Sequence, residues 1–149
     1  MITWRLQETI ERPADDVWHL AADVGRHVEW MGAPDTPTSG NPSKVGGRIA
    51  YVYKLGPFTF NALAEVAAAK PGRRIGWRVV AGAPFSAEYL LDLEASGPGT
   101  TRAVWSGSME PKGWWRILTP LFAMETREGE AKELRRLKAL AETGRLASA

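Results

Sequence analysis

Five strand-like segments between residues 47 and 109 follow one another at nearly even spacing, and tight turns separate them. Within each segment apolar and polar side chains alternate, as they do in strands with one buried and one solvent-exposed face. The segments are 47–55, 58–66, 73–80, 85–94 and 101–109, and the intervening turns are rich in Gly and Pro. This pattern predicts an antiparallel meander with one face exposed to solvent.

The N-terminal part of the chain predicts one more strand, over 2–11, and two short helices. Pro13 suits the first turn of a helix, and Asp15 and Asp16 favour the positive end of its dipole. Gly25 interrupts this helix, so a second short helix is expected through Trp30. The segment 32–43 contains several Pro and Gly residues and predicts a loop, which we interpret as a lid.

The C-terminal part, from about Gly113 to Gly144, predicts a long amphipathic helix, because apolar residues recur there every three or four positions. Pro120 places the start of the helix or a kink near that residue, and Gly144 is expected to end it. A helix over 120–143 would be about 36 Å long at 1.5 Å per residue. It therefore needs a wide surface to lie on, which the meander provides.

The composition limits the kinds of protein to which this chain can belong. The 149 residues suffice for one domain, expected over 1–149, and 44% of them are hydrophobic. The absence of cysteine excludes disulfides, thiol nucleophiles and cysteine-based metal sites. The net charge of +2 disfavours nucleic-acid binding. With no signal pattern or long apolar run, we expect a cytoplasmic protein without integral membrane association, either monomer or homodimer.

Several short motifs occur in a defined order. They are Ile10–Trp18 followed by Asp23 and Trp30, then Val45–Ile49, Glu65-Val66, Pro71–Trp77, Gly99–Arg102 and Leu134–Lys138. Their order resembles the START-like or Bet v 1-like superfamily (SRPBCC), in its polyketide cyclase/dehydrase and lipid-transport branch. The resemblance spans essentially the whole chain. It implies an α+β helix-grip fold, with a curved antiparallel sheet of about six or seven strands around the long helix and two short helices after strand one.

The resemblance also implies an apolar cavity between sheet and helix. From the residues alone a packed core is the alternative, although seven Trp residues are many for a solid core of this size. The candidate ligand-binding residues share the inward faces of the predicted elements. They are Trp30, Tyr51, Tyr53, Phe58, Phe60, Trp77, Phe85, Tyr89, Trp105, Ile117, Leu121 and Met124.

Few residues suggest chemistry. Glu8 has the parity of the inward residues of its strand, and Tyr51 and Tyr53 could orient or protonate a ligand, so these three are the weak catalytic candidates. His19, Asp23 and His27 stand four residues apart, but Gly25 breaks the helix between them. We therefore interpret them as surface residues and predict neither a metal nor a cofactor.

Three functions remain open at this stage. The first is binding of a small hydrophobic or aromatic, polyketide- or lipid-like molecule, with cyclase or dehydratase activity. The second is a carrier or sensor that binds such a ligand without chemistry. The third is a partner-interaction module that uses the adjacent Trp114 and Trp115, which cannot share one helix face.

Overall fold

A computed structural model describes residues 1–32 and 34–148 of the chain, and the side chains up to Thr143. Its strands form a single sheet. Its seven strands are antiparallel and lie in the order β1-β7-β6-β5-β4-β3-β2. Their bounds are β1 Ile2–Ile10, β2 Thr36–Ser39, β3 Arg48–Leu55, β4 Phe58–Lys70, β5 Arg74–Ala81, β6 Phe85–Gly97 and β7 Thr100–Pro111. The predicted meander is confirmed, and β1 closes it by pairing with β7.

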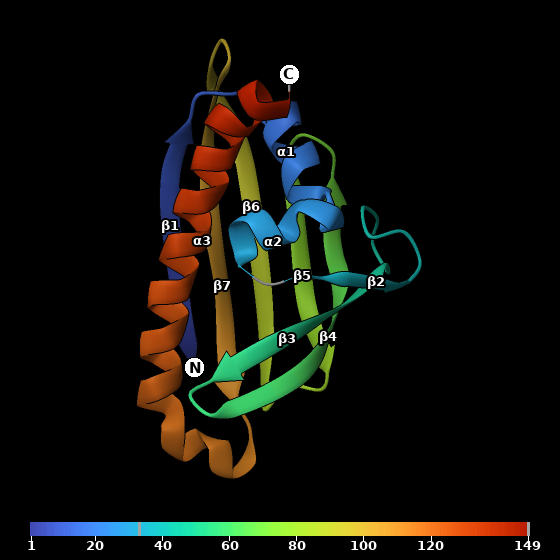
Figure 1. Cartoon of the computed structure of the whole chain (residues 1–149). Helices are drawn as coiled ribbons and strands as arrows, with labels where there is room; N and C mark the ends of the chain where they lie inside the picture. The colour runs from blue at the N-terminus through green and yellow to red at the C-terminus, as the bar shows by residue number, and fades with distance from the viewer. Residues whose placement is uncertain (33, 149) are drawn as a thin grey trace.

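Helices cover one face of this sheet (Figure 1). Two short helices, α1 (Ala14–Ala22) and α2 (His27–Met31), follow β1 and are joined by the 3-10 turn Val24–Arg26. The long helix α3 (Thr119–Ser148) runs beside β1 and β7, and the β3–β4 hairpin bends across the same face (Figure 1). Register shifts within β4 mark bulges, which curve a sheet. The predicted α+β helix-grip fold is confirmed.

The start of α3 agrees with the sequence and its end does not. Pro120 occupies the first turn, where a missing backbone N–H costs nothing. The expected end at Gly144 is wrong, because the helix continues to Ser148. A glycine costs a helix interior only about 1 kcal/mol, so it does not by itself stop a helix.

Strand β2 lies inside the segment that the sequence predicts to be a loop. It pairs with β3 at the edge of the sheet, and all four of its residues are exposed. Since no residue of this strand faces a core, the alternation that reveals the other strands is missing. Pro37 is tolerated there because edge strands do not need every backbone N–H.

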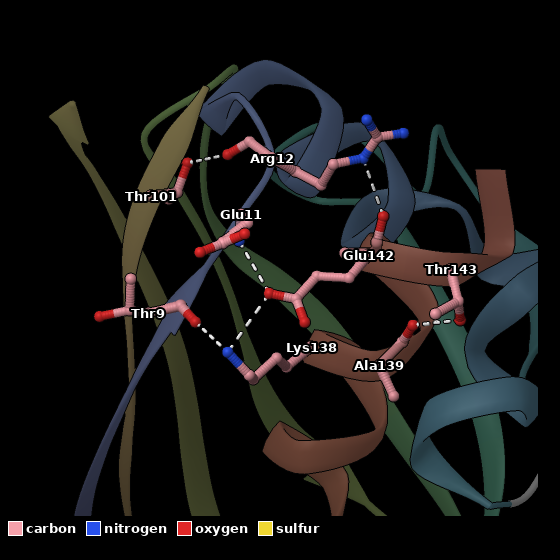
Figure 2. A network of polar contacts seen from close by, with 9 residues as sticks. Thr9, Glu11, Arg12, Thr101, Lys138, Ala139, Glu142 and Thr143 are labelled. Carbon is pink, nitrogen blue, oxygen red and sulfur yellow. Dashed lines mark hydrogen bonds and ion pairs between the residues drawn. The ribbon is translucent and has the colours of Figure 1, made fainter. Parts of the chain in front are cut away.

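Polar contacts fasten the C-terminal half of α3 to the end of β1 (Figure 2). The ammonium group of Lys138 donates to the carbonyl oxygen of Thr9, and Glu142 accepts from the backbone N–H of Glu11 at 2.8 Å. Arg12 Nε donates to the carbonyl of Ala141 at 2.9 Å. These contacts hold the C-terminal half of the helix against the end of β1.

Candidate functional site

A cavity of about 220 Å³ lies between the inner face of the sheet and α3. Its lining comes from β3, β4, β5, β6 and β7, from α3, and from the end of α2 with the segment that follows. The lining residues are Met31, Asp35, Ile49, Tyr51, Val52, Tyr53, Lys54, Ala64, Trp77, Tyr89, Trp105, Glu130 and Glu133. A cavity of about 150 Å³ can hold benzene, so this one has room for an aromatic ring with a short substituent.

The strand register explains why aromatic side chains meet here. Trp77 on β5 pairs with Tyr89 on β6, and Tyr89 pairs in turn with Gly107 on β7. Gly107 leaves room for Trp4, whose ring lies where a Cβ would stand, and Trp4 contacts Tyr89 at 5.5 Å between ring centroids. The alternation of side chains along the strands therefore places aromatic rings on the inner face of the sheet. Small residues such as Gly107 leave the space that these rings occupy.

Two buried polar atoms in the cavity lining have no hydrogen-bond partner among the described residues: the hydroxyl of Tyr51 and the indole N–H of Trp77. Trp77 is only 3% exposed. Leaving a buried donor unpaired costs about 1–3 kcal/mol. The Tyr51 hydroxyl lies near that of Tyr89 without forming a hydrogen bond of normal geometry. The indole N–H groups of Trp4 and Trp30, which do not line the cavity, also lack a partner among the described residues.

The three tyrosines of the cavity remain neutral at physiological pH. Burial raises the pKa of Tyr53 to about 12. Burial also raises the pKa of Tyr51 and of Tyr89 above the ordinary value for a phenol. Each hydroxyl can therefore donate one hydrogen bond and accept others.

A pair of carboxyl groups faces the aromatic wall from α3. Glu130 is 7% exposed and accepts a hydrogen bond from the indole N–H of Trp105. Glu133 lies one turn further along the helix, close enough for its carboxyl group and that of Glu130 to influence each other. Burial raises the pKa of both groups, and the neighbouring Glu130 carboxylate raises that of Glu133 further. The hydrogen bond from Trp105 counteracts part of this rise at Glu130, so Glu133 holds its proton more firmly than Glu130 does.

A third carboxyl group at the cavity belongs to Asp35. Its Oδ2 lies 2.6 Å from Nδ1 of His27, and Nε2 of His27 donates to the carbonyl oxygen of Ala21 at 2.7 Å. Nε2 must carry a hydrogen because a carbonyl only accepts. His27 is fully buried, so its interpretation as a surface residue is wrong. Its ring fixes Asp35 and packs edge-on against Trp30 and Trp77.

The predicted ligand-binding residues fall into several groups. Tyr51, Tyr53, Trp77, Tyr89 and Trp105 line the cavity. The remainder do not: Trp30 and Phe85 are buried in the core around it, Phe58 and Phe60 contact Trp115, Leu121 is half-buried, and Ile117 and Met124 are exposed. The catalytic candidate Glu8 pairs with Ala103 on β7 and does not line the cavity.

Two of these residues were expected on the inner face of the long helix and do not lie there. Ile117 is 79% exposed because Gly113–Leu118 forms 3-10 turns, to which the α-helical period does not apply. Met124 is 51% exposed, whereas Phe122 is fully buried. Two positions span roughly 200° around an α-helix, so an inward Phe122 turns Met124 outward.

Sequence reasoning missed Asp35, Glu130 and Glu133. A usable signal existed for Glu130, which stands four residues before Leu134 and seven before Leu137, both buried residues of α3. A carboxylate in phase with an apolar stripe is a candidate for the interior. Asp35 had no such signal, because the adjacent segment shows no alternation.

The adjacent Trp114 and Trp115 lie in the 3-10 segment Gly113–Leu118, which precedes α3. The two rings stack at 4.1 Å between centroids, and Trp115 contacts Phe58 and Phe60 of the β3–β4 hairpin. Trp114 is 61% exposed.

None of the helices in the described part of the chain has the length and apolar character to span a membrane.

Solved structures with the same fold include several bacterial proteins. The Zhui aromatase/cyclase from Streptomyces sp. R1128 matches with a TM-score of 0.80 and 12% identity, over 95% of this chain and 93% of that chain. TTHA0849 from Thermus thermophilus matches with a TM-score of 0.79 and 18% identity, over 99% of both chains. DR_A0006 from Deinococcus radiodurans matches with a TM-score of 0.70 and 21% identity, over 97% of this chain and 99% of that chain. At these identities the likeness shows the fold alone.

No curated protein matches the sequence. The model of one protein family does, over residues 1–142, and its description is polyketide cyclase/dehydrase and lipid transport. The match spans the sheet, the short helices and nearly all of α3, including each residue that lines the cavity. The chain therefore belongs to the polyketide cyclase/dehydrase and lipid-transport family.

Proposed function

We propose that this protein binds a small aromatic molecule in the cavity beneath α3. The observation that carries the proposal is an aromatic-walled space of about 220 Å³ whose lining includes two unpartnered polar groups, on Tyr51 and Trp77. A ligand that presents an apolar ring to the walls and an oxygen to these groups would satisfy both.

The size of the cavity narrows the range of ligands. Pockets for drug-sized molecules measure about 300–1,000 Å³, so the space here favours one substituted ring over a fused multi-ring system. The family description names polyketides and lipids. Within those classes the volume favours a small polyketide-like ring or a short-chain compound.

Acid–base chemistry on the bound molecule is the second candidate function, and the Glu130–Glu133 pair favours it. Two neighbouring carboxyl groups in an aromatic cavity, both with raised pKa values, can give and take a proton. Cyclisation or dehydration would use such a pair. A carrier or sensor would bind the same ligand and leave it unchanged, so turnover of a bound compound separates the two.

Filling the cavity is expected to weaken binding without unfolding the protein. Ala64 lines the cavity from β4 and is 3% exposed, so Ala64→Leu places three additional carbons in the space that a ligand needs. We expect affinity for small aromatic compounds to fall at least about tenfold, which corresponds to about 1.4 kcal/mol. Isothermal titration calorimetry with a panel of single-ring aromatic alcohols and ketones measures this loss.

Ala67→Leu is the matched control, because Ala67 is an exposed residue of the same strand. It should bind every compound as the wild type does. Unchanged affinity in Ala64→Leu, with its fold confirmed by circular dichroism, would place the binding site elsewhere.

A further inference from the structure

The cavity lining has more acidic than basic side chains. Three carboxyl groups line it, on Asp35, Glu130 and Glu133, and the lining cation among the described residues is Lys54, which is exposed. Asp35 has its own partner in His27. Arg136 acts on Glu133 from the next turn of α3, but its side chain is exposed beside Gly32. The Glu130–Glu133 pair therefore lacks a cation inside the described part of the cavity.

Of the two carboxyl groups, Glu130 gives up its proton more readily, because Trp105 donates a hydrogen bond to it. This indole N–H is a neutral donor, and the neighbouring Glu133 brings a second carboxyl group and no cation. The other groups that face Glu130 are the phenols of Tyr51, Tyr53 and Tyr89, which are neutral as well. A buried carboxylate without a cationic partner costs folding free energy, which a cation supplied by a ligand would recover.

The walls of the cavity suit a cation. The rings of Trp77, Trp105, Tyr51, Tyr53 and Tyr89 surround the space, and the faces of such rings attract organic ammonium groups. Trp77 adds a donor to the lining, because its buried indole N–H has no partner among the described residues and can give a hydrogen bond to an acceptor atom. A ligand that suits this cavity would therefore combine a cationic group for the carboxyl groups, an apolar ring for the aromatic faces and an acceptor atom for the indole N–H.

We propose that the preferred ligand is an aromatic amine, whose protonated nitrogen pairs with Glu130 and Glu133 and whose ring carries an oxygen that accepts from Trp77. This inference rests on the proposed function and specifies the class of ligand. A preference for an amine would distinguish this cavity from one that selects its ligand by apolar contact alone.

The test compares three probes with the same ring and different charge: para-methoxyphenethylamine, para-methoxyphenethyl alcohol and para-methoxyphenylpropanoate. Calorimetric titration at neutral pH measures the affinity of each. We expect the amine to bind at least about tenfold more tightly than the alcohol, and the carboxylate to bind most weakly because it meets a like charge.

The double variant Glu130→Gln/Glu133→Gln removes the charge and keeps the shape. It should bind the amine no more tightly than it binds the alcohol. Glu128→Gln is the matched control, since Glu128 is an exposed residue of the same helix, outside the cavity lining. It should keep the full preference for the amine.

The outcomes separate the two proposals. Equal affinity of the wild type for amine and alcohol, or a preference that survives in the double variant, would overturn the inference and leave the proposed function standing. Absence of binding by all three probes would count against the proposed function itself, and the inference would fail with it.

Discussion

Glu133→Gln is expected to make the protein more stable at pH 8 and to leave its stability unchanged at pH 4. Burial and the Glu130 charge raise the pKa of Glu133, so the folded state must keep a proton there that the unfolded chain releases. The cost is absent below the unfolded pKa of about 4.3 and grows as the pH rises toward the folded pKa. Glutamine donates to Glu130 at every pH, and the gain should be about 1–3 kcal/mol.

Urea denaturation of wild type and variant from pH 4 to pH 9 measures this difference. The exposed Glu128→Gln removes the same formal charge from α3 and should show no such pH dependence. A destabilised Glu133→Gln at pH 8 would mean that Glu133 is ionised and paired in the folded protein, contrary to the arrangement of the two carboxyl groups described above.

Gly82→Ala should destabilise the protein by about 3 kcal/mol or more, because two penalties coincide. Gly82 has φ +80°, a left-handed conformation that alanine adopts only with strain. A Cβ there would also stand 2.0 Å from the carbonyl oxygen of Asn61, a backbone atom of β4 that cannot move without disturbing the sheet. The midpoint of urea unfolding should fall accordingly.

Gly99→Ala separates the two penalties. Gly99 also has a positive φ, +68°, but a Cβ at this position meets no described atom within 4 Å. Its loss of stability should be clearly smaller than that of Gly82→Ala. Equal losses in the two variants would show that backbone strain alone accounts for the effect at Gly82.

The sheet was predictable because its signal is local. Strands β3 to β7 have one buried and one exposed face, so alternation of residues such as Ile75, Trp77 and Val79 reveals them one by one. Strand β2 has no buried face and gave no signal. The continuation of α3 beyond Gly144 was equally hidden, since a helix end depends on local conformation and packing as well as on the residue type.

The candidate site was predictable only in part. The parity of β3, β5, β6 and β7 placed Tyr51, Tyr53, Trp77, Tyr89 and Trp105 on the inner face, where the cavity lies. The acidic half of the cavity was missed because Glu130 and Glu133 look like ordinary solvated residues of a charged helix. His27 was misplaced for a related reason, since its burial depends on contacts with Ala21 and Asp35 that no local pattern contains.

The indole N–H signals of the seven Trp residues test the central claim most directly, because each reports one place in the fold. In a 15N-labelled sample titrated with para-methoxyphenethyl alcohol, we expect the signals of Trp77 and Trp105 to shift, since both line the cavity. The signals of Trp18, bonded to the carbonyl of Arg74, and of the exposed Trp114 should stay in place. Shifts confined to Trp114 and Trp115 would contradict a ligand site beneath α3 and favour the outer surface instead.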